Sequence, residues 1–307
     1  MKENHFSIRR KMHFPLVAAI LLALFTTSCV EMVTNVDFPD QDPKIVVHAF
    51  LSPADTAAIA MLTWSIPITE SHNHNGLRFI DNAQVVISDG MQADAQLVYN
   101  AKRKIYTVST NVFRIQEDQS YHLRVEVPGR PTVSASCHVP PPNSSLHFIG
   151  IDTIPGSWSS RIVVDYGFTD IPHNNTNYYA AWVYRDVLAQ DHASDSIYSR
   201  KIAFTPVGGD RYFSNIGMEG HDFRLRAESQ YYDYGWGGDE DDYSHPRTIT
   251  LLLMTVDEHY FRYHRALENH NPEDYFFEAS HVYSNVEGGL GVFAGYNRKE
   301  VVIDFNQ

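Results

Sequence analysis

Alternation between apolar and polar side chains is the feature that most constrains how this sequence folds. Between positions 121 and 127, Tyr121, Leu123, Val125 and Val127 alternate with polar residues. Successive side chains of a β-strand point to opposite faces, so this pattern predicts a strand with one buried face. Comparable runs of β-forming residues recur, and we predict strands at 45–51, 83–88, 104–110, 121–127, 132–139, 147–151, 161–168, 177–185, 197–204, 222–229, 247–256 and 300–305.

The chain is therefore predicted to be mainly β, and more specifically a tandem β-sandwich. Short strands separated by turn signals predict an Ig-like or prealbumin-like sandwich over residues 43–139. Three consecutive prolines open a linker at 140–146, because proline cannot donate to a central sheet ladder. A second β-rich domain is predicted over residues 147–307. It contains one short helix at 257–269, where Asp257 is suited to cap the N-terminus.

The N-terminus carries the pattern of a secretory signal peptide, which we place at residues 1–28. Three basic residues at positions 9–11 precede an uncharged run of 12 residues, Phe14–Phe25. Such a run is too short for a transmembrane helix, which needs ~20 apolar residues. Thr26-Thr27-Ser28-Cys29 resembles a bacterial lipobox, where the chain is cleaved before a cysteine that is then lipidated. We expect Cys29 to carry a lipid anchor, followed by a tether at 29–42; the alternative is an ordinary signal peptide with a chance cysteine.

Charge bears on the partners that this chain can have. The formal net charge is −13, and removal of residues 1–28 takes away four basic residues and one acidic residue, which leaves −16. Nucleic-acid binding requires a basic footprint against phosphate, so no nucleic-acid partner is expected. An acidic body also suits a protein that stands away from anionic lipid and is held only by its acyl chains.

Neither the number of cysteines nor the glycine-containing motifs indicate a cofactor. Two cysteines are too few for a disulfide scaffold or a cysteine-based zinc site, and Cys137 is expected to be a small buried apolar residue. Residues 289–294 fit the dinucleotide pattern G-x-G-x-x-G/A, but no helix is predicted to follow, as that motif requires. We interpret the run as a glycine-rich turn or strand where backbones approach closely. No phosphate-binding Gly-Lys-Ser/Thr motif occurs either.

One loop, Tyr231–His245, concentrates the side chains that are candidates for binding. Aromatic residues dominate interface anchors, so a contact surface is one interpretation, and packing over the sandwich edge is the other. Carboxylates at this density suit Ca²⁺, although a run of like charges is more often simply solvated. The candidate contact residues are Tyr231, Tyr232, Tyr234 and Trp236, and the candidate metal ligands are Asp239, Glu240, Asp241 and Asp242.

Several segments together resemble one protein family. They are Cys29 with the Val-Glu that follows it, Pro43–Val47, Ala83–Gly90, the three prolines, Arg211–Ser214, the helix at Tyr260–Leu267 and the tail Val282–Phe293. This combination resembles the DUF4249 family, outer-membrane lipoproteins of Bacteroidota whose function is unknown. The resemblance implies an outer-membrane location and a neighbouring TonB-dependent receptor, because members are often encoded beside one. It implies no catalytic residues and leaves open which face of the membrane the protein occupies.

Three functional hypotheses follow. The first is a non-enzymatic lipoprotein that is accessory to a TonB-dependent transporter. The second is a surface module that binds a carbohydrate or a peptide through the loop Tyr231–His245. The third is a hydrolase with an unrecognised carboxylate pair, since acidic residues are plentiful but their separation is a three-dimensional quantity. The absence of a nucleophile elbow or any other catalytic motif favours the non-enzymatic hypotheses.

Overall fold

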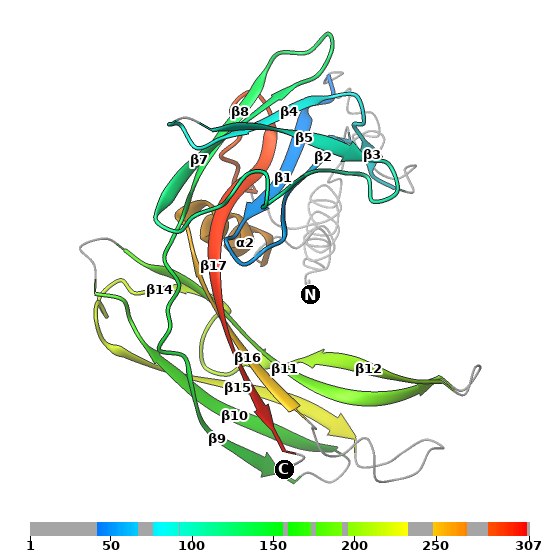
Figure 1. Cartoon of the computed structure of the whole chain (residues 1–307). Coiled ribbons are helices and arrows are strands. Elements are labelled where there is room, and N and C mark those ends of the chain that lie inside the picture. Colours follow the sequence, from blue (N-terminus) through cyan, green and yellow to red (C-terminus); the bar gives the residue numbers. More distant parts are fainter. Residues whose placement is uncertain are drawn as a thin grey trace, which may run out of the picture. The chain divides into compact units, whose positions relative to one another are not determined.

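The computed structural model describes most of the chain after residue 41, as residues 42–66, 76–91, 93–155, 159–172, 176–191, 196–232, 248–268 and 282–305. The structure is mainly β, as predicted, and its strands form two sheets (Figure 1). Of the residues described, none belongs to a helix that is long and apolar enough to cross a bilayer.

The first half of the structure contains eight strands, and most of them lie where alternation predicted them. They are β1 (Ile45–Leu51), β2 (Ala57–Trp64), β3 (Arg78–Phe79), β4 (Gln84–Ser88), β5 (Asp94–Asn100), β6 (Ile105–Ser109), β7 (Gln119–Glu126) and β8 (Val133–Val139). The prediction missed β2, β3 and β5. Three of the eight residues of β2 are alanine and only two are β-branched, so its composition gives a weak strand signal. Its pairing with β1 and β6 holds it in a strand.

The second half contains nine strands and one helix among the residues described. They are β9 (His147–Ile154), β10 (Ser159–Thr169), β11 (Tyr178–Asp191), β12 (Ser196–Ala203), β13 (Thr205–Pro206), β14 (Tyr212–Ser214), β15 (Asp222–Tyr232), β16 (Thr248–Val256), α2 (Glu258–Glu268) and β17 (Leu290–Asp304). The predicted helix is confirmed, with its ends one residue inside the predicted bounds. The predicted last strand is wrong at its start, because β17 begins ten residues earlier than position 300.

A mixed sheet of thirteen strands runs through both halves, in the order β12-β11-β16-β17-β1-β2-β6-β5-β4-β7-β8, with β14 on β11 and β3 on β2. The long strand β17 joins the two parts. Its first residues pair in parallel with β1, and from Tyr296 onward it pairs antiparallel with β16. Figure 1 shows this strand, coloured red, passing from one group of strands to the other. The predicted domain boundary at 140–146 stays a prediction. Strand β17 pairs with β1, which precedes this segment in the sequence, and with β16, which follows it.

Three buried clusters hold the structure together. The first is enclosed by β1, β2 and β4–β8 and includes Cys137, which is 4% exposed and confirms the expected buried thiol. The second lies where the antiparallel sheet β13-β15-β10-β9 packs against β11 and β16. The third is rich in tyrosine and forms where α2 covers β11, β16 and β17. Each cluster removes apolar surface from water, which is the main favourable term in folding.

The glycine-rich segment at 289–294 is the start of β17, where backbones do approach closely. A Cβ on Gly291 would lie 2.9 Å from the Val47 amide nitrogen and closer still to the Val47 carbonyl oxygen. A Cβ on Gly295 would lie 2.6 Å from the His138 carbonyl carbon, on β8. The sequence interpretation of a strand with close backbone contact is therefore confirmed, and β17 lies against both β1 and β8.

Candidate functional site

A groove of about 650 Å³ lies on the outer face of β4, β7 and β8. The inner face of these strands is in the core, where Val85, Leu123 and Val125 are at most 3% exposed. Because side chains alternate along a strand, the residues between them face outward and line the groove. A volume of this size falls within the ~300–1,000 Å³ that is usual for small-ligand pockets.

Strand register arranges the outward side chains in two rows that cross the sheet. In the first row Asp94 is opposite Ser88, Ser88 is opposite His122, and His122 is opposite Ser136. Residues directly opposite each other in a sheet share a face, so these four side chains are neighbours along one line. The first row therefore places an imidazole between two hydroxyls and ends at a carboxylate.

The second row lies two residues further along the strands. Val86 is opposite Arg124, Arg124 is opposite Ser134, and Ser134 forms a bridge with Glu287. The Ser134 hydroxyl lies 3.4 Å from Glu287 Oε2, to which it donates. Arg124 is thus at the middle of the groove and Glu287 is at one wall, whereas the carboxylate of the first row is at the opposite wall.

The two carboxylates of the groove are far apart along the sheet. Asp94 is on β5, and Glu287 lies beyond β8, which is four strand positions away. At ~4.8 Å per strand the path along the sheet is ~19 Å. A glycosidase pair is separated by only ~5–10 Å. The groove therefore gives no support to the hydrolase hypothesis.

The wall beyond β8 is a segment without regular structure, and Asn285 attaches it. The Asn285 Nδ2 amide donates to the carbonyl of Ser136 on β8 at 2.9 Å and to the carbonyl of Phe293 on β17 at 2.8 Å. Its Oδ1 accepts from the Phe293 amide at 3.0 Å. The backbones of Glu287 and Ser134 exchange two hydrogen bonds as well. The Asn285 side chain therefore links β8 to β17 and pairs with backbone groups of both strands.

Asp257 makes the second link between β8 and β17, at the beginning of α2. Its Oδ1 accepts from the Tyr260 amide at 2.8 Å, which confirms the predicted N-cap. Its Oδ2 accepts from the Gly295 amide at 3.0 Å and from the His138 amide at 3.2 Å. Burial raises the pKa of this carboxyl to about 7, even though the backbone amides that donate to it act in the opposite direction.

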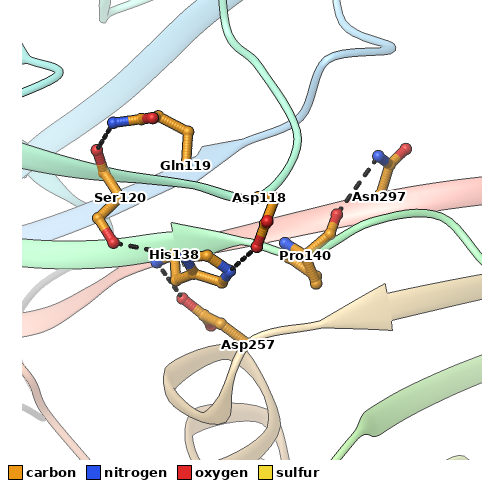
Figure 2. A network of polar contacts seen from close by, with 7 residues as sticks. All are labelled: Asp118, Gln119, Ser120, His138, Pro140, Asp257 and Asn297. Atoms are coloured by element: carbon orange, nitrogen blue, oxygen red, sulfur yellow. Dashed lines mark hydrogen bonds and ion pairs between the residues drawn. The ribbon is translucent and has the colours of Figure 1, made fainter. Parts of the chain in front are cut away.

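Figure 2 shows the polar contacts around this junction, where β8 leads into the proline-rich segment. The His138 ring lies on the outer side, with Nε2 3.5 Å from Asp118 Oδ1 and Nδ1 3.4 Å from the Ser120 hydroxyl. Asn297 Nδ2 donates to the Pro140 carbonyl at 3.4 Å. The end of β8 is therefore fixed from both sides, and this keeps the floor of the groove in place.

A second group of polar side chains lies in the tyrosine-rich cluster under α2. His48 Nε2 lies 2.8 Å from the Tyr263 hydroxyl, and His264 stacks on Tyr212. Burial, together with the neighbouring His48, lowers the pKa of His264 to about 4, so this ring is neutral at pH 7. Within the described ranges no three metal-ligating side chains come together. We therefore regard these histidines as part of the packing.

The residues that sequence analysis proposed as sites lie almost entirely outside the part of the chain that the structure describes. This applies to Cys29, to Tyr234 and Trp236, and to the acidic run at 239–242. Tyr231 and Tyr232 end β15, where their backbones pair with Ser160 and Ser159. These proposals stay predictions. Sequence analysis missed the groove, and the only signal available was the polar face of the alternating strand at 121–127.

A family model described as "Domain of unknown function (DUF4249)" matches residues 33–301, a range that includes both rows of the groove and nearly all of β17. A search of curated proteins finds no match.

Proposed function

We propose that this chain, which belongs to the DUF4249 family, is an outer-membrane lipoprotein and a non-enzymatic binding subunit of a TonB-dependent transporter. The observation that carries the proposal is the order of segments in the sequence. A basic stretch, a short apolar run and Cys29 stand directly before the region that the family model matches, which begins at residue 33. In this account Cys29 carries the acyl chains, and the β structure from residue 43 onward is held at the membrane by a short tether.

The groove supports a binding role for the β structure. It is concave, it is lined by a few convergent polar groups, and its floor is a sheet fixed to its neighbours by Asn285 and Asp257. A rigid floor favours binding because little conformational entropy is lost when a ligand is taken up. We assign the first half to an Ig-like or prealbumin-like sandwich and the second half to another β-rich domain, as the finer description of the fold.

A second binding surface is also part of the proposal. The loop Tyr231–His245 carries the aromatic residues Tyr232, Tyr234 and Trp236 and the acidic run at 239–242. We propose that this loop contacts a carbohydrate or a peptide, and that its acidic run is a candidate Ca²⁺ site. Its aromatic residues are of the type that anchors interfaces.

Recovery of the transporter tests the proposal. The tagged full-length chain is isolated from detergent-solubilised outer membrane, and the proteins that come with it are identified. We expect a β-barrel receptor of the TonB-dependent class in amounts comparable to the tagged chain. The Cys29→Ser variant is the matched control, because loss of the acyl chains should move the protein out of the membrane fraction and reduce receptor recovery. Wild-type protein that is recovered without any such receptor would contradict the proposal.

A further inference from the structure

We propose that the groove on β4, β7 and β8 binds a short zwitterionic peptide of two or three residues, with the peptide carboxylate at Arg124 and its ammonium group at Glu287. This inference rests on the proposed binding function and names the chemical class of the ligand. The juxtaposition that carries it is a cation in the middle of the groove and a carboxylate at the wall of the same row.

The spacing of the two charges sets the length of the ligand. Arg124, Ser134 and Glu287 are consecutive in the second row, so the backbones that carry the two charges are two strand positions apart, or ~10 Å. An extended peptide spans at most ~3.3–3.6 Å per residue. Two or three residues in an extended conformation span ~7–11 Å, which matches the spacing of the two strand positions that carry the charges.

The guanidinium of Arg124 is available to a ligand. Among the described residues it forms an ion pair with Glu126 on the same strand, with 3.4 Å between NH1 and Oε1, and the two side chains are 58% and 42% exposed. An ion pair at this exposure contributes little, because solvent screens it and two side chains must be ordered. A carboxylate that binds in a bidentate geometry offers Arg124 a stronger pairing than this one.

The remaining side chains of the groove suit peptide groups better than sugar rings or apolar ligands. Hydroxyls from Ser88, Ser134 and Ser136 line the groove and can accept from a peptide amide, although the Ser134 hydroxyl donates to Glu287. No Phe, Tyr or Trp is among the described residues that line the groove, so it lacks the large ring faces on which sugar rings usually stack. Val86 is the one outward apolar side chain of the second row, and it can contact an apolar side chain of a peptide.

Titration calorimetry on the full-length chain in detergent tests the assignment, with trialanine, N-acetyl-trialanine and trialanine amide as probes at low salt. We expect saturable binding of trialanine and a loss of affinity of about tenfold or more when either terminus is blocked, because each block removes one charge-assisted contact. In Arg124→Gln, blocking the carboxylate should make little further difference. In Glu287→Gln, blocking the amine of trialanine should make little further difference to the affinity.

Glu117→Gln is the matched control, since Glu117 is an exposed carboxylate that does not line the groove. We expect this variant to change the affinity for trialanine less than about threefold. Glu126→Gln should increase the affinity, because it removes the competing partner of Arg124.

Three results would overturn the inference. The first is no heat of binding up to ~10 mM trialanine, which corresponds to a binding free energy weaker than ~3 kcal/mol. The second is equal binding of trialanine and the blocked peptides, and the third is a loss of affinity in Asp94→Asn, at the other carboxylate of the groove, but not in Glu287→Gln. Peptide binding without recovery of a β-barrel receptor would remove the transporter from the proposed function and leave the ligand class standing. Recovery of the receptor without peptide binding would overturn the proposed ligand class and leave the transporter in the proposed function.

Discussion

Replacement of Gly291 by alanine is expected to destabilise the protein by more than about 4 kcal/mol, or to prevent the recovery of folded protein. Gly291 is on β17 opposite Val47 of β1, and its φ is 103°, a backbone conformation that residues with a Cβ rarely adopt. A methyl group there would lie 2.9 Å from the Val47 amide nitrogen and would overlap the carbonyl oxygen of the same residue. Both contacts are backbone atoms of a paired strand, so β17 would have to separate from β1. Denaturant unfolding followed by circular dichroism measures the effect.

Gly150→Ala is the matched control for this prediction. Gly150 is also in a strand, but a Cβ there would meet no atom within 4 Å and its φ is not positive. The same substitution should therefore change the free energy of unfolding by less than about 1 kcal/mol. Equal effects of the two substitutions would show that β17 and β1 do not approach as closely as the structure places them.

Replacement of Asp257 by alanine is the second large effect that we expect, at ~3–5 kcal/mol of destabilisation. The side chain accepts from three backbone amides, those of Tyr260, Gly295 and His138, which belong to α2, β17 and β8. Each buried donor that is left without a partner costs ~1–3 kcal/mol, and water entering the gap recovers part of this. Asp94→Ala, at an exposed carboxylate, should change the stability by less than about 0.5 kcal/mol. A loss below about 1 kcal/mol in the Asp257 variant would contradict its role as a link between the three elements.

Asp257 also predicts a pH dependence of stability. Its folded pKa of about 7 is above the ordinary value of 3.8 for an unfolded aspartate, because burial disfavours the charged form. Between these two values the folded state binds more protons than the unfolded state, so this group alone makes stability fall as the pH rises from ~4 to ~7. Asp257→Asn cannot ionise, and the difference in stability between wild type and this variant should shrink over that interval as the pH rises. A difference that grows with pH would contradict the raised pKa.

The local sequence pattern predicts those strands in which apolar and polar residues alternate. At 121–127 the apolar positions are buried and the polar positions face outward, as alternation requires. The helix was also predicted from local features, since Asp257 caps it and a tyrosine face packs inward. In each of these elements the residues that decide the conformation are neighbours in the sequence.

The sequence pattern does not locate features that depend on residues far apart in the chain. The first part of β17 is apolar at nearly every position and contains glycines, so it shows no alternation, and its place between β1 and β8 is decided by close backbone contact. The groove was missed for a related reason. His122 and Arg124 could be assigned to an outward face, but only the sheet register shows that Asp94 and Glu287, nearly 200 residues apart in the sequence, belong to the same surface.

Mass spectrometry of the mature N-terminus tests whether the protein is held at the outer membrane by a lipid on Cys29. The full-length chain is expressed in its native host, purified from the membrane fraction and digested. We predict an N-terminal peptide that begins at Cys29 and carries the added mass of its acyl chains, with no peptide from residues 1–28. An unmodified Cys29, or a mature chain that begins at another residue, would contradict the account.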